Sequence, residues 1–398
     1  MVLFMFKLQL TAWHERYAKM GEFAGWFMPL WYKGAIQEHR AVRENVGFFD
    51  ISHMGELFVI GHDAEDFLNI IVTSDITKIR DGKSKYTVIC NERGAVKDDV
   101  VVYRFNKEKY MIICNAVNRD KVSAWIKSLL MAATLFGDIE IDFFDGSFDH
   151  ALFAVQGPEA PHLAELMGIE LPGSFSFNRQ SIDDIDVLVS RTGYTGEDGF
   201  EVLIQDRHPF HPDKDKRGEP KRIKSFFSYM LDAGKDISLE ACGLFARDTL
   251  RLEAGFTLYG NDMWEKQLPA RTIDSLTPFE CGLGFCVDMD KKRFIGKEAL
   301  ELRQQTPEKS QILLRLMERG IPRPHCKVFK DNTEIGMVTS GSLVPTTPGG
   351  IAIALVRHDS YELGDILEIE IRGKKIPARV VKKPFYNPEK YGKKRKSR

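Results

Sequence analysis

The chain has 398 residues, enough for two or three domains, and 43% of them are hydrophobic, so sizeable cores can form. Its 56 basic and 57 acidic side chains give a net charge of −1, which supplies no overall field for a nucleic acid. No apolar run approaches the length of a membrane span, and the start MVLFMFKLQL lacks the layout of a secretion signal. The six cysteines include no Cys-x-x-Cys pair. We therefore expect a cytoplasmic protein with reduced thiols that binds neither membranes nor nucleic acid.

Helix and strand patterns alternate through the first 140 residues. The periodicity predicts a helix at 34–46 that ends at Gly47, a strand at 55–61 and a helix at 63–72. Three hairpin-connected strands and a closing helix follow, at 84–90, 98–105, 109–114 and 118–132. This order favours an α+β unit over a doubly wound sheet.

The middle of the chain repeats this character. The expected elements are a strand at 150–156, a helix at 157–168, strands near 185–191 and 198–204, and helices at 221–233 and 239–253. The polar, proline-containing stretch 206–221 predicts an exposed loop.

Beyond about residue 305, short strands are separated by Gly, Pro and Asn, which predicts a small antiparallel barrel or sandwich. The basic residues at the end, YGKKRKSR, are expected to be frayed, either solvated or in contact with an acidic partner.

Several common enzyme motifs are absent. The chain has no G-x-G-x-x-G after a strand, no phosphate-binding loop and no G-x-S-x-G elbow, and its ten histidines form no metal-ligand set. We therefore expect no nicotinamide, no ATP and no metal.

Asp98 and Asp99 are the first polar residues of interest. At the start of a predicted strand their side chains point to opposite faces, so one is expected to face solvent and the other the interior. A carboxylate at the edge of a pocket can accept a proton or stabilise a developing cation. Both could instead be turn or cap residues.

Glu201 follows three glycines, Gly193, Gly196 and Gly199, whose spacing permits close backbone approach or positive φ. Alternation places its carboxylate on the same face as Leu203, where a buried charge needs a partner. That partner could be the two adjacent N–H donors of a pterin-like ring or a neighbouring arginine.

Arg247 and Arg251 recur on one face of the last predicted helix of this region, with Asp248 and Glu253 nearby. By itself this pattern favours a structural network of ion pairs.

Together these segments resemble the glycine cleavage T-protein family. The resemblance extends from FAGWFMPLWY (23–32) to KPFYNPEKYG (383–392) and is most specific in SRTGYTGEDGFEV (190–202) and GLFARDTLRLEAGFTLYGNDM (243–263). It implies an α+β, three-domain cloverleaf folate-binding fold with a small C-terminal antiparallel β-barrel. The corresponding domains would be 1–52 with 140–300, an inserted domain at 53–139, a barrel at 301–392 and a basic tail at 393–398.

The resemblance also implies roles for individual residues. Asp99 matches the catalytic carboxylate of the family, Glu201 the carboxylate that binds the pterin ring, and Arg247 a substrate-binding arginine. The other positions that match residues lining the folate site are Tyr391, Tyr86, Tyr103, Asn115 and Tyr194. Two positions depart from the usual pattern: Phe285 replaces a frequent Trp, and Val344 replaces a frequent Ser.

The implied activity is an aminomethyltransferase of glycine catabolism. A lipoylated H-protein would present an S-aminomethyl group, and tetrahydrofolate would accept the one-carbon unit to give 5,10-methylenetetrahydrofolate and ammonia. The alternatives are another tetrahydrofolate-dependent demethylase and a non-catalytic folate-binding module.

Overall fold

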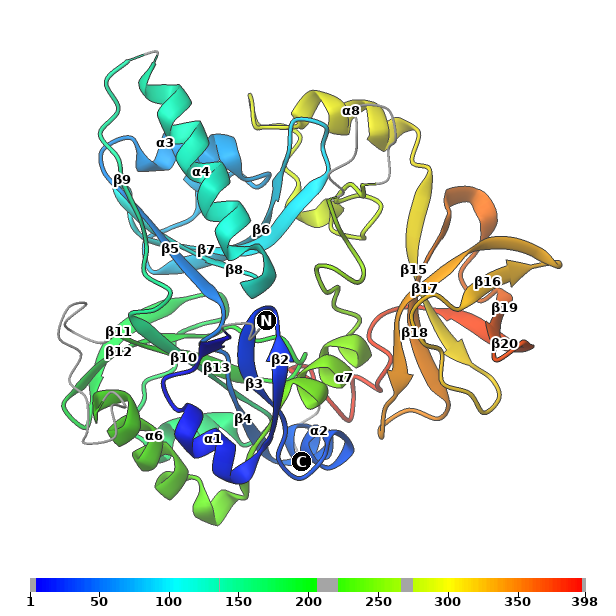
Figure 1. Cartoon of the computed structure of the whole chain (residues 1–398), viewed down its shortest axis with the longest axis horizontal. Coiled ribbons are helices and arrows are strands. Elements are labelled where there is room, and N and C mark those ends of the chain that lie inside the picture. Colours follow the sequence, from blue (N-terminus) through cyan, green and yellow to red (C-terminus); the bar gives the residue numbers. More distant parts are fainter. Residues whose placement is uncertain (1–4, 136, 206–220, 266–274, 396–398) are drawn as a thin grey trace.

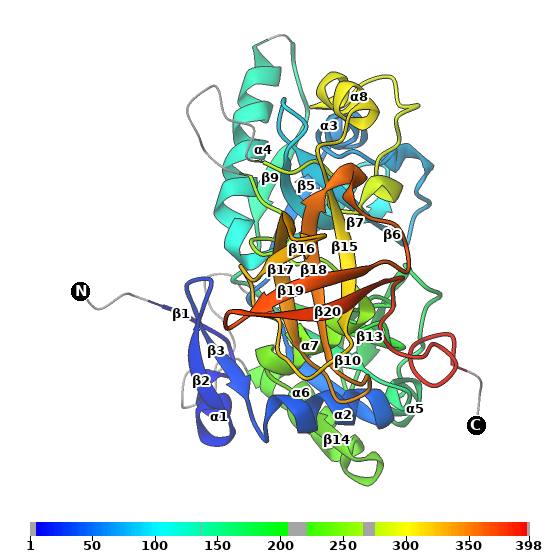
Figure 2. The same cartoon turned by 90° about the vertical axis from the view of Figure 1, so that its right-hand side faces the viewer.

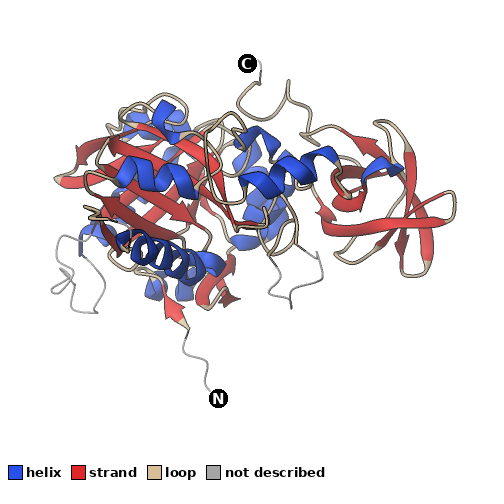
Figure 3. Cartoon of the chain, turned by 90° about the horizontal axis from the view of Figure 1, so that it is seen from above, coloured by secondary structure: helices blue, strands red, loops and turns tan. Residues whose placement is uncertain are grey.

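The computed structural model describes residues 5–135, 137–205, 221–265 and 275–395. Three lobes make up the molecule: a five-stranded sheet and a six-stranded sheet lie on one side, and a closed barrel lies on the other (Figure 1). Viewed from above, the barrel occupies one end of the molecule, apart from both sheets (Figure 3). The α+β class and the C-terminal antiparallel barrel predicted from the sequence are confirmed.

The six-stranded sheet, called here the central sheet, combines strands from distant parts of the chain. Its order is β11 (Phe177–Ile182), β12 (Ile185–Ser190), β13 (Gly199–Gln205), β10 (His150–Gln156), β4 (Val46–Asp50) and β14 (Leu239–Ala241). One face packs against α5 (Ala160–Leu166) and α6 (Lys221–Ala233) through a core that includes Phe153, Phe200 and Phe226.

The five-stranded sheet, called here the inserted sheet, lies between β4 and β10 in sequence. Its order is β6 (Lys83–Cys90), β7 (Val96–Asn106), β8 (Lys109–Cys114), β5 (Gly55–Ile60) and β9 (Asp142–Asp145). The helices α3 (Ala64–Ile71) and α4 (Arg119–Thr134) cover one face. The other face packs on the central sheet, where Phe58, Tyr103 and Met111 meet Phe49 and Leu203.

The barrel closes in the order β15 (Lys309–Leu316), β18 (Gly350–Arg357), β17 (Thr333–Leu343), β16 (Lys327–Lys330), β19 (Ile366–Ile371) and β20 (Lys374–Val381), with β20 pairing back to β15 (Figure 2). Alternate apolar side chains fill its interior. The helix α7 (Leu244–Ala254) joins the barrel to the central sheet, because Leu252 packs against Ile351 and Ile353 of β18.

The remaining elements connect or flank these units. They are β1 (Phe6–Lys7), α1 (Thr11–Tyr17), β2 (Lys19–Phe23), β3 (Trp26–Trp31), α2 (Ala35–Glu44), α8 (Lys297–Gln305) and the 3₁₀ turns η1 (Ile76–Lys78), η2 (Ala116–Asn118), η3 (Lys235–Ile237), η4 (Gly284–Cys286) and η5 (His358–Ser360). β1, β3 and β2 form a small sheet that the sequence pattern did not predict.

The predicted boundaries at Gly47 and at residue 239 are wrong. The helix α2 ends at Glu44, and Gly47 lies inside β4, where a Cβ atom would approach Val42 Cγ2 to 2.5 Å. Gly47 is therefore explained by close packing and not by helix termination. The helix expected from residue 239 begins at Leu244, because 239–241 pair in parallel with β4 as β14. The predicted loop at 206–221 lies outside the described residues except for Lys221, and the proposed domain boundaries stay a prediction.

Candidate functional site

Asp99 is held by donors from the two strands that flank β7. The Tyr86 hydroxyl of β6 donates to Oδ2 of Asp99 at 2.9 Å, and Nδ2 of Asn115, which follows β8, donates to Oδ1 at 2.8 Å. Burial raises the pKa of Asp99 above its usual value, and these two hydrogen bonds lower it. Asp99 as a whole residue is half-buried. The structure therefore brings three of the predicted site residues together.

Asp98 does not face solvent, contrary to the sequence-based expectation. It points to the other face of the inserted sheet, but that face is covered by α4, and Asp98 is fully buried. Its carboxylate accepts the backbone N–H of Asn115 at 3.0 Å and contacts Nδ2 of both Asn115 and Asn118. β7 also begins two residues earlier, at Val96, so the two aspartates lie within the strand.

Glu201 lies near the start of β13, on the face that meets the inserted sheet. The Thr192 hydroxyl donates to Oε2 of Glu201, and no described residue donates to Oε1. Burial raises the pKa of Glu201, whereas the Thr192 hydrogen bond and the positive charges of Arg247 and Lys393 lower it. Among the described residues Glu201 forms no ion pair, so one of its carboxylate oxygens is left for a ligand.

Arg247 projects from α7 over the ring of Tyr194, with its guanidinium carbon 4.8 Å from the ring centroid. Burial lowers the pKa of Arg247, and electrostatic interactions with Tyr194 and Glu201 oppose this shift. The guanidinium of Arg247 has no hydrogen bond or ion pair with any described residue, so its five N–H donors are not used within this part of the chain. The structural ion-pair network expected for this helix does not include Arg247.

That network forms on other residues of α7. Arg251 pairs with Asp248 at 2.8 Å and with the buried Asp262 at 2.6 Å, and Glu253 pairs with Arg43 of α2 at 2.7 Å. The prediction was therefore correct for Arg251 and Glu253, which hold α7 in place, and wrong for Arg247.

Aromatic rings connect the remaining predicted residues. Tyr194 stacks on Phe256 with centroids 5.8 Å apart, and Phe256 packs against the cluster that contains Tyr391. Burial and, after it, the negative charge of Asp99 raise the pKa of Tyr86. The pKa of Tyr194 is raised by burial, lowered by the charge of Arg251 and raised again by the charge of Asp99. The Asp99 cluster and the Tyr194 cluster therefore lie within electrostatic range of each other.

Tyr103 has a different position from the other predicted residues. It is 1% exposed, and its hydroxyl lies 3.1 Å from Oγ of Ser190 and 3.3 Å from Oγ1 of Thr192. It therefore supports Glu201 indirectly, through Thr192. Thr192 was not predicted as a site residue, although it stands two residues before Tyr194 in the same polar segment.

The C-terminal segment contacts this site, so residues 393–395 are not frayed as expected. Arg395 forms an ion pair with the buried Glu197, and the backbone N–H of Lys393 donates to the carbonyl of Gly196 at 3.1 Å. Gly196 has a φ of +79°, and a Cβ atom there would lie 2.6 Å from the Tyr386 hydroxyl. The glycine-rich segment thus allows the close approach predicted for it.

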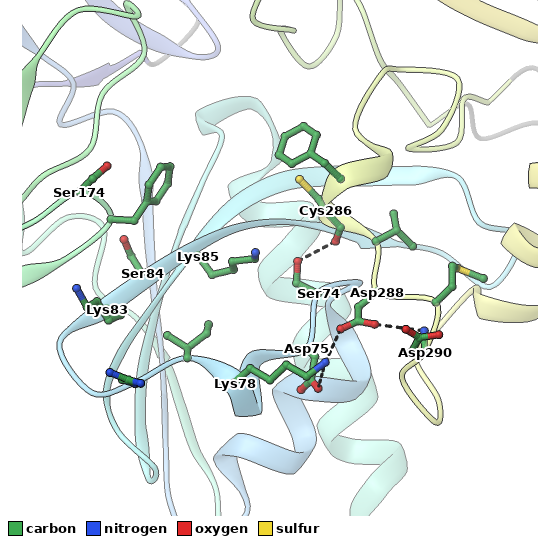
Figure 4. Close-up of a pocket in the computed structure, with 16 residues that line it drawn as sticks. Ser74, Asp75, Lys78, Lys83, Ser84, Lys85, Ser174, Cys286, Asp288 and Asp290 are labelled. Atoms are coloured by element: carbon green, nitrogen blue, oxygen red, sulfur yellow. Dashed lines mark hydrogen bonds and ion pairs between the residues drawn. The ribbon is translucent and has the colours of Figure 1, made fainter. Parts of the chain in front are cut away.

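A cavity of about 670 Å³ opens beside the start of β6, where Lys83, Ser84 and Lys85 line it (Figure 4). The ring of Phe285, which lines this cavity, stacks on Tyr86 with centroids 6.2 Å apart. Lys78 is paired with Asp75 and Asp288 at one end of the cavity, and Lys83 and Lys85 line it from β6. None of the eight predicted site residues lines the cavity itself.

Two further observations concern the described residues alone. They contain no group of three or more His, Cys, Asp or Glu side chains that could hold a metal ion. None of their helices is long and apolar enough to cross a membrane.

The fold is shared with a protein of known structure. The crystal structure of glycine cleavage system aminomethyltransferase T from Bartonella henselae matches 98% of this chain and 100% of its own length, with a TM-score of 0.82 and 31% sequence identity. The three-lobed α+β architecture with a C-terminal barrel is therefore that of this class of protein.

Sequence comparison leads to the same class. Residues 10–291 match the family model described as the GCVT N-terminal domain, and residues 309–387 match the glycine cleavage T-protein C-terminal barrel domain. A probable aminomethyltransferase of Thermococcus kodakarensis is 44% identical, covering 97% of this chain and 98% of its own. An aminomethyltransferase of Desulfitobacterium hafniense is 37% identical, covering 96% and 99%. The chain belongs to the glycine cleavage T-protein family, which confirms the resemblance seen in the motifs.

Proposed function

We propose that this protein is an aminomethyltransferase that transfers the one-carbon unit of S-aminomethyl-dihydrolipoyl H-protein to tetrahydrofolate, giving 5,10-methylenetetrahydrofolate and ammonia. The chain belongs to the T-protein family, and the observation that carries the proposal is that Oε1 of Glu201 and the guanidinium of Arg247 have no hydrogen-bond partner among the described residues. We also propose that it acts in the cytoplasm, in glycine catabolism.

The residues present fit a folate. Glu201 offers an acceptor oxygen to the adjacent N–H groups of a pterin. Arg247, which is within electrostatic range of Glu201, offers unused N–H donors. The rings of Tyr86, Tyr194 and Phe256 supply flat apolar surfaces for stacking. Lys83 and Lys85, which line the cavity next to Tyr86, would bind the carboxylates at the glutamyl end of the ligand.

Asp99 would act where the folate nitrogen meets the one-carbon unit. Its anionic carboxylate, oriented by Tyr86 and Asn115, would stabilise the positive charge that develops as the amine leaves the one-carbon unit. It would also orient the folate nitrogen that attacks this carbon and accept its proton.

The decisive experiment measures ammonia release from aminomethyl-loaded H-protein with and without tetrahydrofolate. We expect release to be fast only with tetrahydrofolate, accompanied by formation of methylenetetrahydrofolate. Turnover of small N-methyl substrates without H-protein would instead favour a demethylase, and folate binding without any turnover would favour a non-catalytic module.

Glu201→Gln should weaken folate binding, because one acceptor oxygen becomes a donor that faces pterin N–H groups. Losing a charged hydrogen bond costs roughly 1.5–3 kcal/mol, or about a 10- to 150-fold higher Kd. Isothermal calorimetry with tetrahydrofolate measures this change. Glu44→Gln, at an exposed position of α2, is the matched control. Equal affinities in the two variants would exclude Glu201 from the pterin site.

Turnover of the carrier should depend on salt. Carrier proteins of this kind are usually acidic, and Lys382, Lys383, Lys390 and Lys394 are exposed along the C-terminal segment. Electrostatic steering is screened over about 8–10 Å at physiological salt, so kcat/KM for H-protein should fall as ionic strength rises while folate affinity changes less.

The test combines salt titration with charge removal. Replacing Lys382 and Lys390 by Gln should flatten the salt dependence, whereas deleting 393–398 would also remove the Arg395–Glu197 ion pair and confuse the result. A KM for the carrier that does not vary with salt would reject steering without affecting the proposed transferase activity. The other basic segment suggested by the sequence, Lys214–Arg222, lies mostly outside the described residues.

A further inference from the structure

Asp98 and Asp99 form a pair of carboxylates joined by one amide. Nδ2 of Asn115 lies 2.9 Å from Oδ1 of Asp98 and 2.8 Å from Oδ1 of Asp99. Among the described residues neither carboxylate has an ion pair. Two ionised carboxylates so close together, in a site with little solvent, repel each other strongly, so the pair favours keeping one proton.

Asp98 is fully buried whereas Asp99 is half-buried, and this difference in burial indicates that Asp98 keeps the proton. The side chain of Asn118 lies 2.5 Å from Oδ1 of Asp98. The atom placed there is Nδ2, and N–H···O contacts as short occur elsewhere, as from Gln9 Nε2 to the His150 carbonyl at 2.5 Å, so the distance alone does not identify the donor. The oxygen and nitrogen of an Asn amide can be exchanged by a flip, and Asn118 makes no other side-chain hydrogen bond with the described residues. In the flipped orientation the contact fits an O–H of Asp98 that donates to the amide oxygen of Asn118.

The charged surroundings agree with this assignment. The titratable groups in electrostatic range of Asp98 are Asp99 on β7, Cys114 on β8, Lys121 on α4 and Tyr259 after α7. Lys121 is the cation of this set, but its Nζ donates to the Tyr259 hydroxyl at 2.7 Å and lies 4.0 Å from Glu265, which also pairs with Lys97. Burial, followed by the negative charge of Asp99, raises the pKa of Asp98 to about 8.

We propose that Asp98 is a protonated, neutral carboxyl group at neutral pH, and that by holding this proton it keeps Asp99 as the ionised member of the pair. Asp98 is then a positioning residue. It fixes Asn115 through the backbone N–H of that residue, and Asn115 in turn orients the Asp99 carboxylate. The protonation state can be tested alone, while its consequence for catalysis rests on the proposed function.

Asp98→Asn is the first test, because an amide has nearly the shape of a neutral carboxyl. Its oxygen can accept the Asn115 N–H and its NH₂ can donate to the amide oxygen of Asn118. In infrared spectra of the substrate-free protein at neutral pH, we expect the parent-minus-variant difference to contain the carbonyl band of one protonated carboxylic acid. A difference that contains only a carboxylate band would overturn the proposal.

Stability as a function of pH gives a second measurement on the same variant. The pKa of Asp98 rises from 3.8 to about 8 in the folded state, so this group stabilises the fold most at low pH, and its contribution is lost as pH rises through about 8. The amide that replaces this carboxyl in the variant does not titrate. The free energy of unfolding of Asp98→Asn, relative to that of the parent, should therefore increase as the pH rises from 3.8 to about 8. A difference between the two proteins that stays constant over this range would contradict the proposal.

Asn118→Ala distinguishes the two protonation states of Asp98 by the direction in which the titration of Asp98 shifts. It also provides a test if Asp98→Asn does not fold. If Asn118 accepts the proton of Asp98, its loss destabilises the neutral form and moves the titration of Asp98 to lower pH. If Asn118 donates to an ionised Asp98, its loss moves the titration to higher pH and the proposal is wrong. Both readouts use protein without substrate, so they stand even if the transferase assay fails. For an active enzyme, loss of the ionisation near pH 8 from the kcat/KM profile of Asp98→Asn would support the positioning role.

Discussion

Asp99→Asn is expected to lower kcat by roughly 10²-fold or more, the loss typical of a positioned acid–base or electrostatic group. The substitution removes the negative charge and keeps the shape. It should leave the fold intact, because Asp99 is half-buried and both neighbours can still be satisfied. The amide oxygen can accept from Asn115, and the amide NH₂ can donate to the Tyr86 hydroxyl, which accepts as well as donates.

The measurement is single-turnover methylenetetrahydrofolate formation at saturating carrier and folate, with the melting temperature recorded for each variant. Asp359→Asn in the barrel, where the side chain is 97% exposed, provides the matched control. A large drop in melting temperature for Asp99→Asn would mean that the residue is structural. Equal losses of kcat in Asp98→Asn and Asp99→Asn would contradict the assignment of different roles to the anionic Asp99 and the neutral Asp98.

The second large effect concerns stability. Arg43 is completely buried, and its guanidinium bonds to Glu253 at 2.7 Å, to Glu197 at 3.0 Å and to two backbone carbonyls. Removing one partner of a buried ion pair leaves uncompensated charge in the core, at a cost of about 3–5 kcal/mol. We expect Arg43→Met to lower the free energy of unfolding by this amount, because Glu253 and Glu197 would lose their shared cation.

Urea unfolding followed by tryptophan fluorescence measures the change. Arg40→Met is the matched control, because Arg40 is exposed on the same helix, and surface substitutions usually change stability by no more than about 0.5 kcal/mol. Arg43→Lys should recover only part of the loss, since an ammonium lacks the planar fork that reaches several acceptors. An unchanged free energy of unfolding in Arg43→Met would show that the network adds little net stability.

Local patterns predicted much of the fold. The hairpins of the inserted sheet and the strands of the barrel follow from alternation and from turn residues, which act over a few positions. The end of α2 was misplaced because close packing requires Gly47: a Cβ atom there would lie 2.5 Å from Val42 Cγ2 and 2.7 Å from Sγ of the distant Cys242. Contacts between residues about 200 positions apart leave no periodic pattern, and the pairing of β14 with β4 is of the same kind.

The sequence predicted some contacts of the site correctly and others not. Asp99, Tyr86 and Asn115 come together because neighbouring strands place them in register, as a hairpin pattern implies. The burial of Asp98 depends on how α4 packs over the inserted sheet, which strand alternation cannot show. Arg247 and Arg251 look alike in sequence, but only Arg251 meets Asp262, from the loop beyond α7. The family resemblance separated these two arginines where spacing could not.

The nesting of one sheet within another also bears on how the chain folds. β4 and β10 pair in the central sheet although about 100 residues separate them, and closing a loop of that length costs about 4 kcal/mol in chain entropy. The whole inserted sheet lies within this loop, and its first and last strands, β5 and β9, pair with each other. Once it has folded, the ends of β4 and β10 are already neighbours, and most of the entropic barrier to joining them is gone. During synthesis the inserted sheet is complete before β10 is made, so the order of translation matches the order that makes closure of the central sheet fastest.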